Sequence, residues 1–195
     1  MSAWDNALDR WVTGFVVAHR SAGATAVADA VMWLGATSRG LVLLAVGGAI
    51  VVIAFRAWRT VFAAVLALAA AAVAAATLKS VFERPRPPAD LAMVLTTGYS
   101  FPSTQATETA AVAVAVVLTA PWARRPPSRP VAVALAAVTA LVGVCMVYLG
   151  AHWTTDVLAG WLIGAVIGAA ASGLVLAVSR LSVGPLQRLA RTRRR

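Results

Sequence analysis

The chain has 195 residues, of which 61% are hydrophobic and only 12% are charged. A soluble globular domain is about 45–50% apolar, so this composition excludes an ordinary soluble fold and indicates a membrane protein. The net charge of +10 does not indicate nucleic acid binding, because much of it lies in the terminal run 188–195 and in short loops beside apolar segments, where it orients the chain and attracts anionic lipids.

Residues 1–17 precede the apolar part of the chain and predict an amphipathic helix at the membrane interface. Their large apolar side chains recur at helical spacing, and tryptophan is typical of the headgroup level. These side chains are Trp4, Leu8, Trp11 and Phe15.

Six apolar segments follow in chain order. The first, 21–35, is short and contains Asp29; it is either a tilted first span or a helix lying against the bundle, and we favour the span. The other five have spanning length, about 17 to 22 residues each. They are 39–55, 60–78, 105–121, 130–150 and 157–178.

These segments predict an all-α integral membrane protein. We expect a bundle of five to six transmembrane helices, with the amphipathic helix at its N-terminal end. The sequence predicts one domain, 1–178, followed by a basic tail, 179–195.

The arginines predict how the bundle faces, because cytoplasmic loops collect Lys and Arg. They gather between the first two long segments, between the third and fourth, and in the tail. This side is therefore predicted to be the cytoplasmic face of a cell membrane, with His19 on it, and the loops 79–104 and 150–156 then open on the extracytoplasmic side. The loop arginines are Arg56, Arg59, Arg124, Arg125 and Arg129.

The first extracytoplasmic loop begins with a basic cluster. Lys79 is the only lysine in the chain, and Arg84 and Arg86 follow it between prolines that stiffen the loop. A lysine at a helix end can simply extend to the membrane interface. However, this cluster lies on the side where basic residues are expected to be scarce. Lysine as a point charge and arginine as a bidentate fork together suit a phosphate.

The second loop contains a histidine and an aspartate at helical spacing. His152 and Asp156 are four residues apart, so on a helical turn the carboxylate can reach one ring nitrogen and leave the other facing a cavity. This arrangement makes a nucleophile. The alternative is an interfacial hydrogen bond with a helix-capping role.

A Pro-Ser-Thr-Gln sequence, residues 102–105, opens the helix that follows the basic loop. Ser103 or Thr104 could simply cap that helix. Capping is compatible with function, because the free N–H groups of a helix N-terminus bind phosphate.

These three motifs together resemble the type 2 phosphatidic acid phosphatase superfamily. The matching features are a lysine, six residues and Arg-Pro; a Pro-Ser helix start; and a histidine, three residues and an aspartate. The resemblance covers about residues 5 to 178. It implies a six-helix bundle with a phosphohistidine mechanism, in which His152 attacks phosphorus, Asp156 orients the imidazole, and Lys79 and Arg86 hold the phosphoryl oxygens.

The resemblance also implies the rest of the site and its substrates. Ser103, Thr104 and Gln105 would complete the phosphate cradle, with Arg84 as a further candidate ligand. Substrates of the family are lipid phosphates and diphosphates, and no metal or other cofactor is used. The expected partners are therefore a lipid substrate and the bilayer, with no nucleic acid, and the oligomeric state is not specified.

Two positions depart from the family pattern. Gln105 stands where the family has a histidine that protonates the leaving group, and Cys145 and Met146 stand where it has Ser-Arg, so one cationic ligand is missing. Glu108, one turn after Gln105, is either a replacement acid or a residue that packs or bonds between helices. His19, on the predicted opposite side, is a poor substitute.

The sequence thus leads to two functions. The favoured one is phosphatase or phosphotransferase activity on a lipid phosphate or diphosphate, with polyprenyl diphosphate preferred because a phosphate leaving group hardly needs a proton from the protein. The alternative is an impaired pseudo-phosphatase that binds, presents or moves a lipid phosphate. A channel or transporter is disfavoured, because the sequence shows no pair of broken helices at mid-membrane depth, which such a protein is expected to contain.

Overall fold

The computed structural model describes residue 4 and the ranges 6–36, 57–120 and 128–192. These ranges form six α-helices and no strand, which confirms the prediction of an all-α membrane bundle. The predicted span 39–55 and the arginines at 56, 124 and 125 lie outside the described residues. The helices are α1 (Ala7–Ala18), α2 (Ala22–Ala36), α4 (Trp58–Phe82), α5 (Thr104–Thr119), α6 (Ser128–Tyr148) and α7 (Thr154–Thr192).

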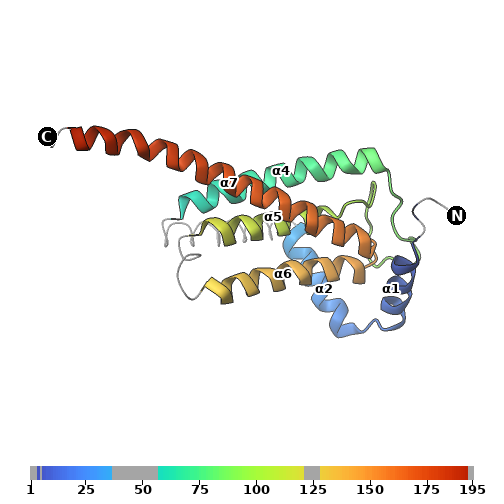
Figure 1. The fold of residues 1–195 in the computed structure, drawn as a ribbon. Coiled ribbons are helices and arrows are strands. Elements are labelled where there is room, and N and C mark those ends of the chain that lie inside the picture. The colour runs from blue at the N-terminus through green and yellow to red at the C-terminus, as the bar shows by residue number, and fades with distance from the viewer. Residues whose placement is uncertain (1–3, 5, 37–56, 121–127, 193–195) are drawn as a thin grey trace.

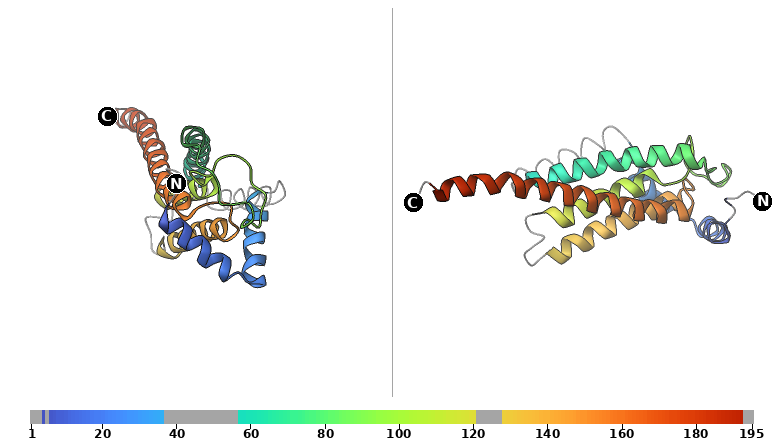
Figure 2. Two further views of the ribbon diagram at one scale, coloured as in Figure 1. Left: turned by 90° about the vertical axis from the view of Figure 1, so that its right-hand side faces the viewer. Right: turned by 45° about the horizontal axis from the view of Figure 1, so that its top comes forward.

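Four of the described helices form the bundle. Helices α4, α5, α6 and α7 run alongside one another (Figure 1), and α5 contacts the other three. Helix α1 lies across one end of this bundle, as both views in Figure 2 show. This end, where α4 and α6 finish and α5 and α7 begin, is called the α1 end below.

Three of the described helices are long and apolar enough to cross a membrane. They are α4, the part of α6 from Arg129, and the part of α7 that ends at Leu181. The 25 residues of α4 rise about 37 Å, more than the roughly 30 Å of a hydrocarbon core. Helix α7 continues beyond the predicted segment 157–178 to Thr192. Hydropathy marks the end of the apolar part of a helix and not the end of the helix itself.

Small side chains let α4 lie close to α5. An alanine recurs at every fourth position of α4 and is completely buried, and two buried alanines of α5 belong to the same cluster. A four-residue repeat keeps these methyl groups on one helix face. Such small-residue faces allow close backbone approach in membrane helices. The buried alanines of α4 are Ala63, Ala67, Ala71 and Ala75, and the first three of them cluster with Ala111 and Ala115 of α5.

Three glycines bring α7 still closer to α5. A Cβ atom added at Gly160, Gly164 or Gly168 would lie 2.9, 2.2 and 2.4 Å from the nearest backbone oxygen of α5 or its cap. Backbone atoms cannot move aside as a flexible side chain can. The glycines therefore fix the register between α5 and α7, and with it the relative positions of their N-terminal ends.

The N-terminal part of the chain lies on a different side from the one predicted. Arg20, next to His19, donates hydrogen bonds at the α1 end to the carbonyl oxygens of Leu91 and Tyr148, at 2.8 and 2.9 Å. The prediction that His19 lies opposite the two loops is therefore wrong. It assumed that 21–35 crosses completely, but the 15 residues of α2 rise only about 22 Å, and α2 packs against α6.

The glycine contacts lead to a stability prediction. We expect Gly164→Ala to destabilise the protein by about 1–3 kcal/mol, because the new methyl group overlaps the carbonyl oxygen of Thr107. Thermal unfolding in detergent measures this loss. Gly173 is the matched control on the same helix, since a Cβ there meets nothing within 4 Å. Equal melting temperatures for Gly164→Ala and Gly173→Ala would contradict the proposed register contact.

Candidate active site

The basic loop begins where α4 ends. Glu83 takes a left-handed conformation with φ of 47° and its N–H bonds to the carbonyl oxygen of Lys79 at 3.0 Å, and Pro85 cannot continue the helix. Lys79 thus lies in the last turn of α4, where its charge complements the helix dipole. Its Nζ donates to the carbonyl oxygens of Tyr99 and Ser100, at 2.8 and 3.4 Å.

Ser100 holds the two ends of this loop together. It is completely buried, and its N–H donates to the carbonyl oxygen of Arg84 at 2.8 Å. Its Oγ also lies 3.0 Å from the carbonyl oxygen of Pro85, to which it donates. The carbonyl oxygen of Ser100 accepts from both Lys79 Nζ and His152 Nδ1, at 3.4 and 2.8 Å. The ammonium and the imidazole therefore lie beside the same carbonyl group.

Arg86 approaches the imidazole from the other side of the ring. Its Nη1 lies 3.4 Å from His152 Nε2 and donates to the carbonyl oxygen of Ala151 at 2.6 Å. Its Nε donates to the carbonyl oxygen of Gly98 at 3.0 Å. The structure thus brings together the lysine, the arginine and the histidine that the sequence predicted to meet.

Asp156 is completely buried beside this histidine. Its Oδ2 lies 3.6 Å from His152 Nδ1 and accepts the N–H of Trp153 at 2.9 Å. His152 and Asp156 are thus at ion-pair distance and lack the direct hydrogen bond that their spacing predicted. Nδ1 of His152 donates to the carbonyl oxygen of Ser100 instead. A carbonyl oxygen can only accept, so Nδ1 of His152 carries the proton. Nε2 then keeps its lone pair, and it faces Arg86.

The start of α5 adjoins the start of α7. Ser103 is buried and caps α5, its Oγ accepting the N–H of Ala106 at 3.4 Å. The N–H of Ser103 donates to the carbonyl oxygen of Asp156 at 3.1 Å. The half-buried side chains of Thr104 and Gln105 follow in the first turn of α5, and Gln105 makes no side-chain hydrogen bond to the part of the chain that the structure describes.

The two remaining candidate site residues are Arg84 and Glu108. Arg84 is buried and its guanidinium bonds to the carboxylates of Asp9 and Asp156, so it does not take the phosphate-binding position considered for it. Glu108 is half-buried on α5, and it forms no hydrogen bond or ion pair with Lys79, Arg86 or His152. These contacts therefore give no support to Glu108 as a replacement for the proton-donating histidine of the family.

Cys145 and Met146, which stand where the family has Ser-Arg, lie in the hydrophobic core. Cys145 and Met146 are 4% and 2% exposed and pack in an apolar cluster with Ala28 of α2. The carbonyl oxygen of Met146 accepts the N–H groups of Ala151 and His152, at 3.0 and 3.3 Å. This position thus supports the histidine loop through its backbone and supplies no charge.

The surroundings of His152 favour its neutral form. Burial lowers the pKa of His152 below its ordinary value of 6.5, and the charges of Arg86 and Lys79 lower it further, although the nearby Asp156 carboxylate opposes them. The ring is therefore neutral at pH 7 and gains a proton only below pH 6.5.

A family model described as the PAP2 superfamily matches residues 60–180, which include the lysine, both loops and the histidine–aspartate pair. The chain belongs to the PAP2 superfamily. This confirms the resemblance drawn from the three motifs. A comparison with curated protein sequences finds no match.

Two solved structures share the PAP2 fold of this chain. One is described as the first transmembrane PAP2 type phosphatidylglycerolphosphate phosphatase from Bacillus subtilis, with a TM-score of 0.69 and 27% identity over 85% of this chain and 83% of the other. The second is Aquifex aeolicus LpxE, with a TM-score of 0.71 and 23% identity over 88% of this chain and 98% of the other. The chain thus has the fold of a membrane lipid phosphatase.

Sequence reasoning missed two contributors to this PAP2 site. Asp9 lies in the predicted amphipathic helix and was not singled out as a site residue, yet it is 1% exposed and pairs with Arg84. Ser100 acts through its carbonyl oxygen, which every residue possesses, so its side chain gave no signal. An acidic residue between Leu8 and Trp11, in a helix expected to lie on the membrane, was the one available clue to Asp9.

The electrostatics of His152 can be measured directly, because the chain has only two histidines. In ¹⁵N-histidine NMR spectra we expect the ring of His152 to titrate below pH 6.5. Lys79→Met should raise that pKa, since it removes a positive charge that disfavours the imidazolium.

The variant His19→Gln assigns the two signals, and Arg129→Gln, at the opposite end of the bundle, is the matched charge control. A His152 pKa at or above 6.5, or one that moves equally in Lys79→Met and Arg129→Gln, would contradict the described site.

Proposed function

We propose that this PAP2 protein cleaves or transfers the phosphoryl group of a membrane lipid phosphate or diphosphate through His152. The observation that carries the proposal is the orientation of the imidazole. Nδ1 donates to the carbonyl oxygen of Ser100, so the lone pair of Nε2 faces Arg86. Lys79 bonds to the same Ser100 carbonyl and adds a second positive charge near the ring. A buried nucleophile beside two cations suits an anionic phosphoryl group.

The proposed reaction has two steps. Nε2 of His152 attacks phosphorus, a P–N bond forms, and the P–O bond to the leaving group breaks with its electron pair on that oxygen. Lys79 and Arg86 neutralise the phosphoryl oxygens, and the nearby Asp156 carboxylate stabilises the positive charge that develops on the ring. A water molecule, or an acceptor hydroxyl in a transfer reaction, then attacks phosphorus and restores the free imidazole.

The leaving group decides which substrate suits this site. Gln105 occupies the position of the family's proton donor, and an amide has no proton to give at neutral pH. Loss of a general acid costs about 10²–10⁴ in rate when the leaving group is an alkoxide. The phosphate that leaves a diphosphate is already stable as an anion. A lipid diphosphate, such as a polyprenyl diphosphate, is therefore the substrate that we propose.

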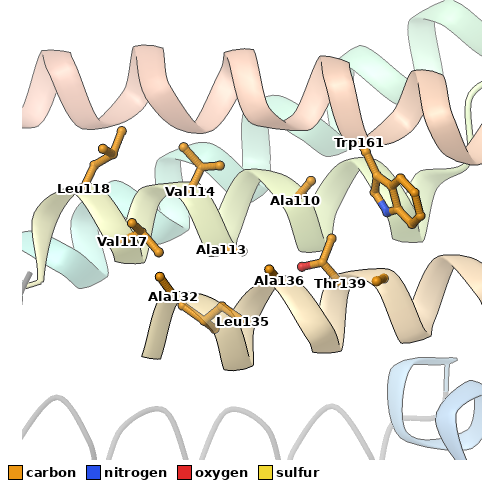
Figure 3. A pocket seen from close by; sticks show the side chains of 11 residues that line it. Ala110, Ala113, Val114, Val117, Leu118, Ala132, Leu135, Ala136, Thr139 and Trp161 are labelled. Carbon is orange, nitrogen blue, oxygen red and sulfur yellow. The ribbon is translucent and has the colours of Figure 1, made fainter. Parts of the chain in front are cut away.

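An apolar groove supports a lipid as the carrier of that phosphate. It has a volume of about 430 Å³ and lies between α5 and α6, from Ala110 to Leu118 along α5, with Trp161 of α7 at one end (Figure 3). Its wall is formed almost entirely by alanine, valine and leucine side chains. A hydrocarbon chain can occupy such a groove while the headgroup lies at the α1 end.

The second candidate function is phosphate binding without cleavage. Gln105 and the buried Met146 favour it, because each replaces a group that the family uses for catalysis. Retention of an oriented His152 favours the enzyme, since a binder has little need of a free imidazole lone pair. In either case we propose that the α1 end faces away from the cytoplasm, because Arg59 and Arg129 begin α4 and α6 at the other end.

An activity assay separates the two functions. We expect purified protein in detergent to release phosphate from polyprenyl diphosphate faster than from phosphatidic acid or phosphatidylglycerol phosphate, and His152→Ala to abolish that release. His19→Ala is the matched control. Phosphate release that survives in His152→Ala would refute the proposed nucleophile, and lipid phosphate binding without release would support the binder.

Right-side-out vesicles given lipid on their outer face test the proposed orientation.

Restoring the family's residue at position 105 tests the leaving-group argument. We expect Gln105→His to raise kcat for a lipid monophosphate roughly 10- to 100-fold, because it supplies a proton donor for the alkoxide. The rate with a lipid diphosphate should change little. Gln105→Asn, which has no titratable proton either, is the control. Equal effects of Gln105→His on both substrate classes would show that leaving-group protonation does not limit the monoester reaction.

A further inference from the structure

The amphipathic helix α1 carries a buried carboxylate. Asp9 is 1% exposed, whereas Leu8, Trp11 and Phe15 of the same helix are 45%, 67% and 52% exposed. Helix α1 thus points an acidic residue into the protein and large apolar side chains away from it. Burying a carboxylate is costly unless it is paired and hydrogen-bonded.

Asp9 meets these requirements at the start of α7 and in the basic loop. Its Oδ1 accepts the N–H of Thr155 at 2.9 Å, and its Oδ2 accepts the hydroxyl of Thr155 at 2.6 Å. Its Oδ2 also pairs with Nη2 of Arg84 at 2.7 Å. One carboxylate of α1 therefore holds both the first turn of α7 and the arginine of the loop.

Arg84 connects Asp9 to the histidine–aspartate pair. Its Nη1 donates to Oδ1 of Asp156 and, at 2.7 Å, to the hydroxyl of Thr155. The guanidinium carbon lies 5.5 and 5.7 Å from the ring centroids of Trp4 and Trp153. The planar fork is thus oriented by its carboxylates and by its aromatic neighbours.

The second carboxylate oxygen of Asp156, Oδ2, completes the link from Asp9 through Arg84 to His152. Arg84 binds Oδ1, while Oδ2 lies 3.6 Å from Nδ1 of His152. Asp156 has no direct hydrogen bond to the imidazole, so its distance from the ring depends on the groups that hold the carboxylate. These groups are Arg84 and the N–H of Trp153.

We propose that Asp9 is a positioning residue for the reaction of His152, acting through Arg84 on the Asp156 carboxylate, so that α1 forms part of the active site. The inference rests on the proposed function for its kinetic consequence. It goes beyond the three family motifs, since Asp9 lies about 70 residues before the first of them.

A purely structural role would not require a charge at this position. Burial of an ion pair is often no more stabilising than an apolar contact of the same volume. Asp9, however, bonds to the residue that binds Asp156 and to the residue that precedes Asp156 in the chain. Both contacts act on the orientation of the same carboxylate.

The test compares Asp9→Asn with Asp29→Asn, an exposed aspartate on α2. In the full-length protein we expect Asp9→Asn to lower kcat roughly 10- to 100-fold, the effect of losing one charge-assisted hydrogen bond. KM and the Kd for inorganic phosphate should change little, because Lys79 and Arg86 do not contact Asp9. The ¹⁵N shift of His152 Nδ1 should move in Asp9→Asn and remain in place in Asp29→Asn.

A second comparison tests whether Asp9 acts through Arg84. In an Arg84→Lys background, Asp9→Asn should lower kcat by much less than it does alone, since residues that act as one unit are not additive. Asp9→Glu, which keeps the charge, should retain more activity than Asp9→Asn. Rates are compared per folded protein, so a loss of stability alone does not imitate the effect.

The outcomes separate this inference from the proposed function. Unchanged kcat and an unchanged His152 shift in Asp9→Asn, or losses that are additive with Arg84→Lys, would overturn the positioning role. A wild-type protein that releases phosphate from no lipid would overturn the proposed function. In that case the His152 shift in Asp9→Asn against Asp29→Asn still decides whether Asp9 positions the pair.

Discussion

The backbone contact between α5 and α7 is the constraint on which the site depends. Glycines at 160, 164 and 168 leave no room for a side chain between the two helices, so their relative shift along the axis is set by main-chain atoms. That register brings the N–H of Ser103 onto the carbonyl oxygen of Asp156. The polar groups of two distant motifs therefore meet because small residues let two apolar helices touch.

The charged groups at the α1 end are organised by main-chain carbonyls as much as by each other. Lys79, Arg86 and His152 all donate to backbone oxygens of the loop regions. These bonds hold the positive charges of Lys79 and Arg86 close to the imidazole of His152 without neutralising them, which leaves a preorganised positive potential around the ring. The carboxylates of Asp9 and Asp156 pair with Arg84 and compensate its positive charge.

Much of this arrangement could be predicted from the sequence, for identifiable reasons. Apolar length located the described bundle helices within a few residues, except at the C-terminal end of α7, and the spacing of Lys79, Arg86, His152 and Asp156 carries the family motifs. The hydrogen bond from His152 to Ser100 could not be predicted, because a carbonyl has no sequence signature. The end of the bundle at which His19 lies was also mispredicted, since hydropathy shows that 21–35 is apolar but not whether this segment crosses the membrane.

The solitary lysine gives this molecule an unusual chemical handle. Lys79 is the only side-chain amine in the chain, and it lies half-exposed beside the imidazole, bonded to the carbonyl oxygens of Tyr99 and Ser100. Amine-selective acylating reagents, which in most proteins react with many surface groups, would here modify one side chain in the candidate site. An occupying anion would shield that amine, so the extent of acylation reports occupancy without any need for turnover.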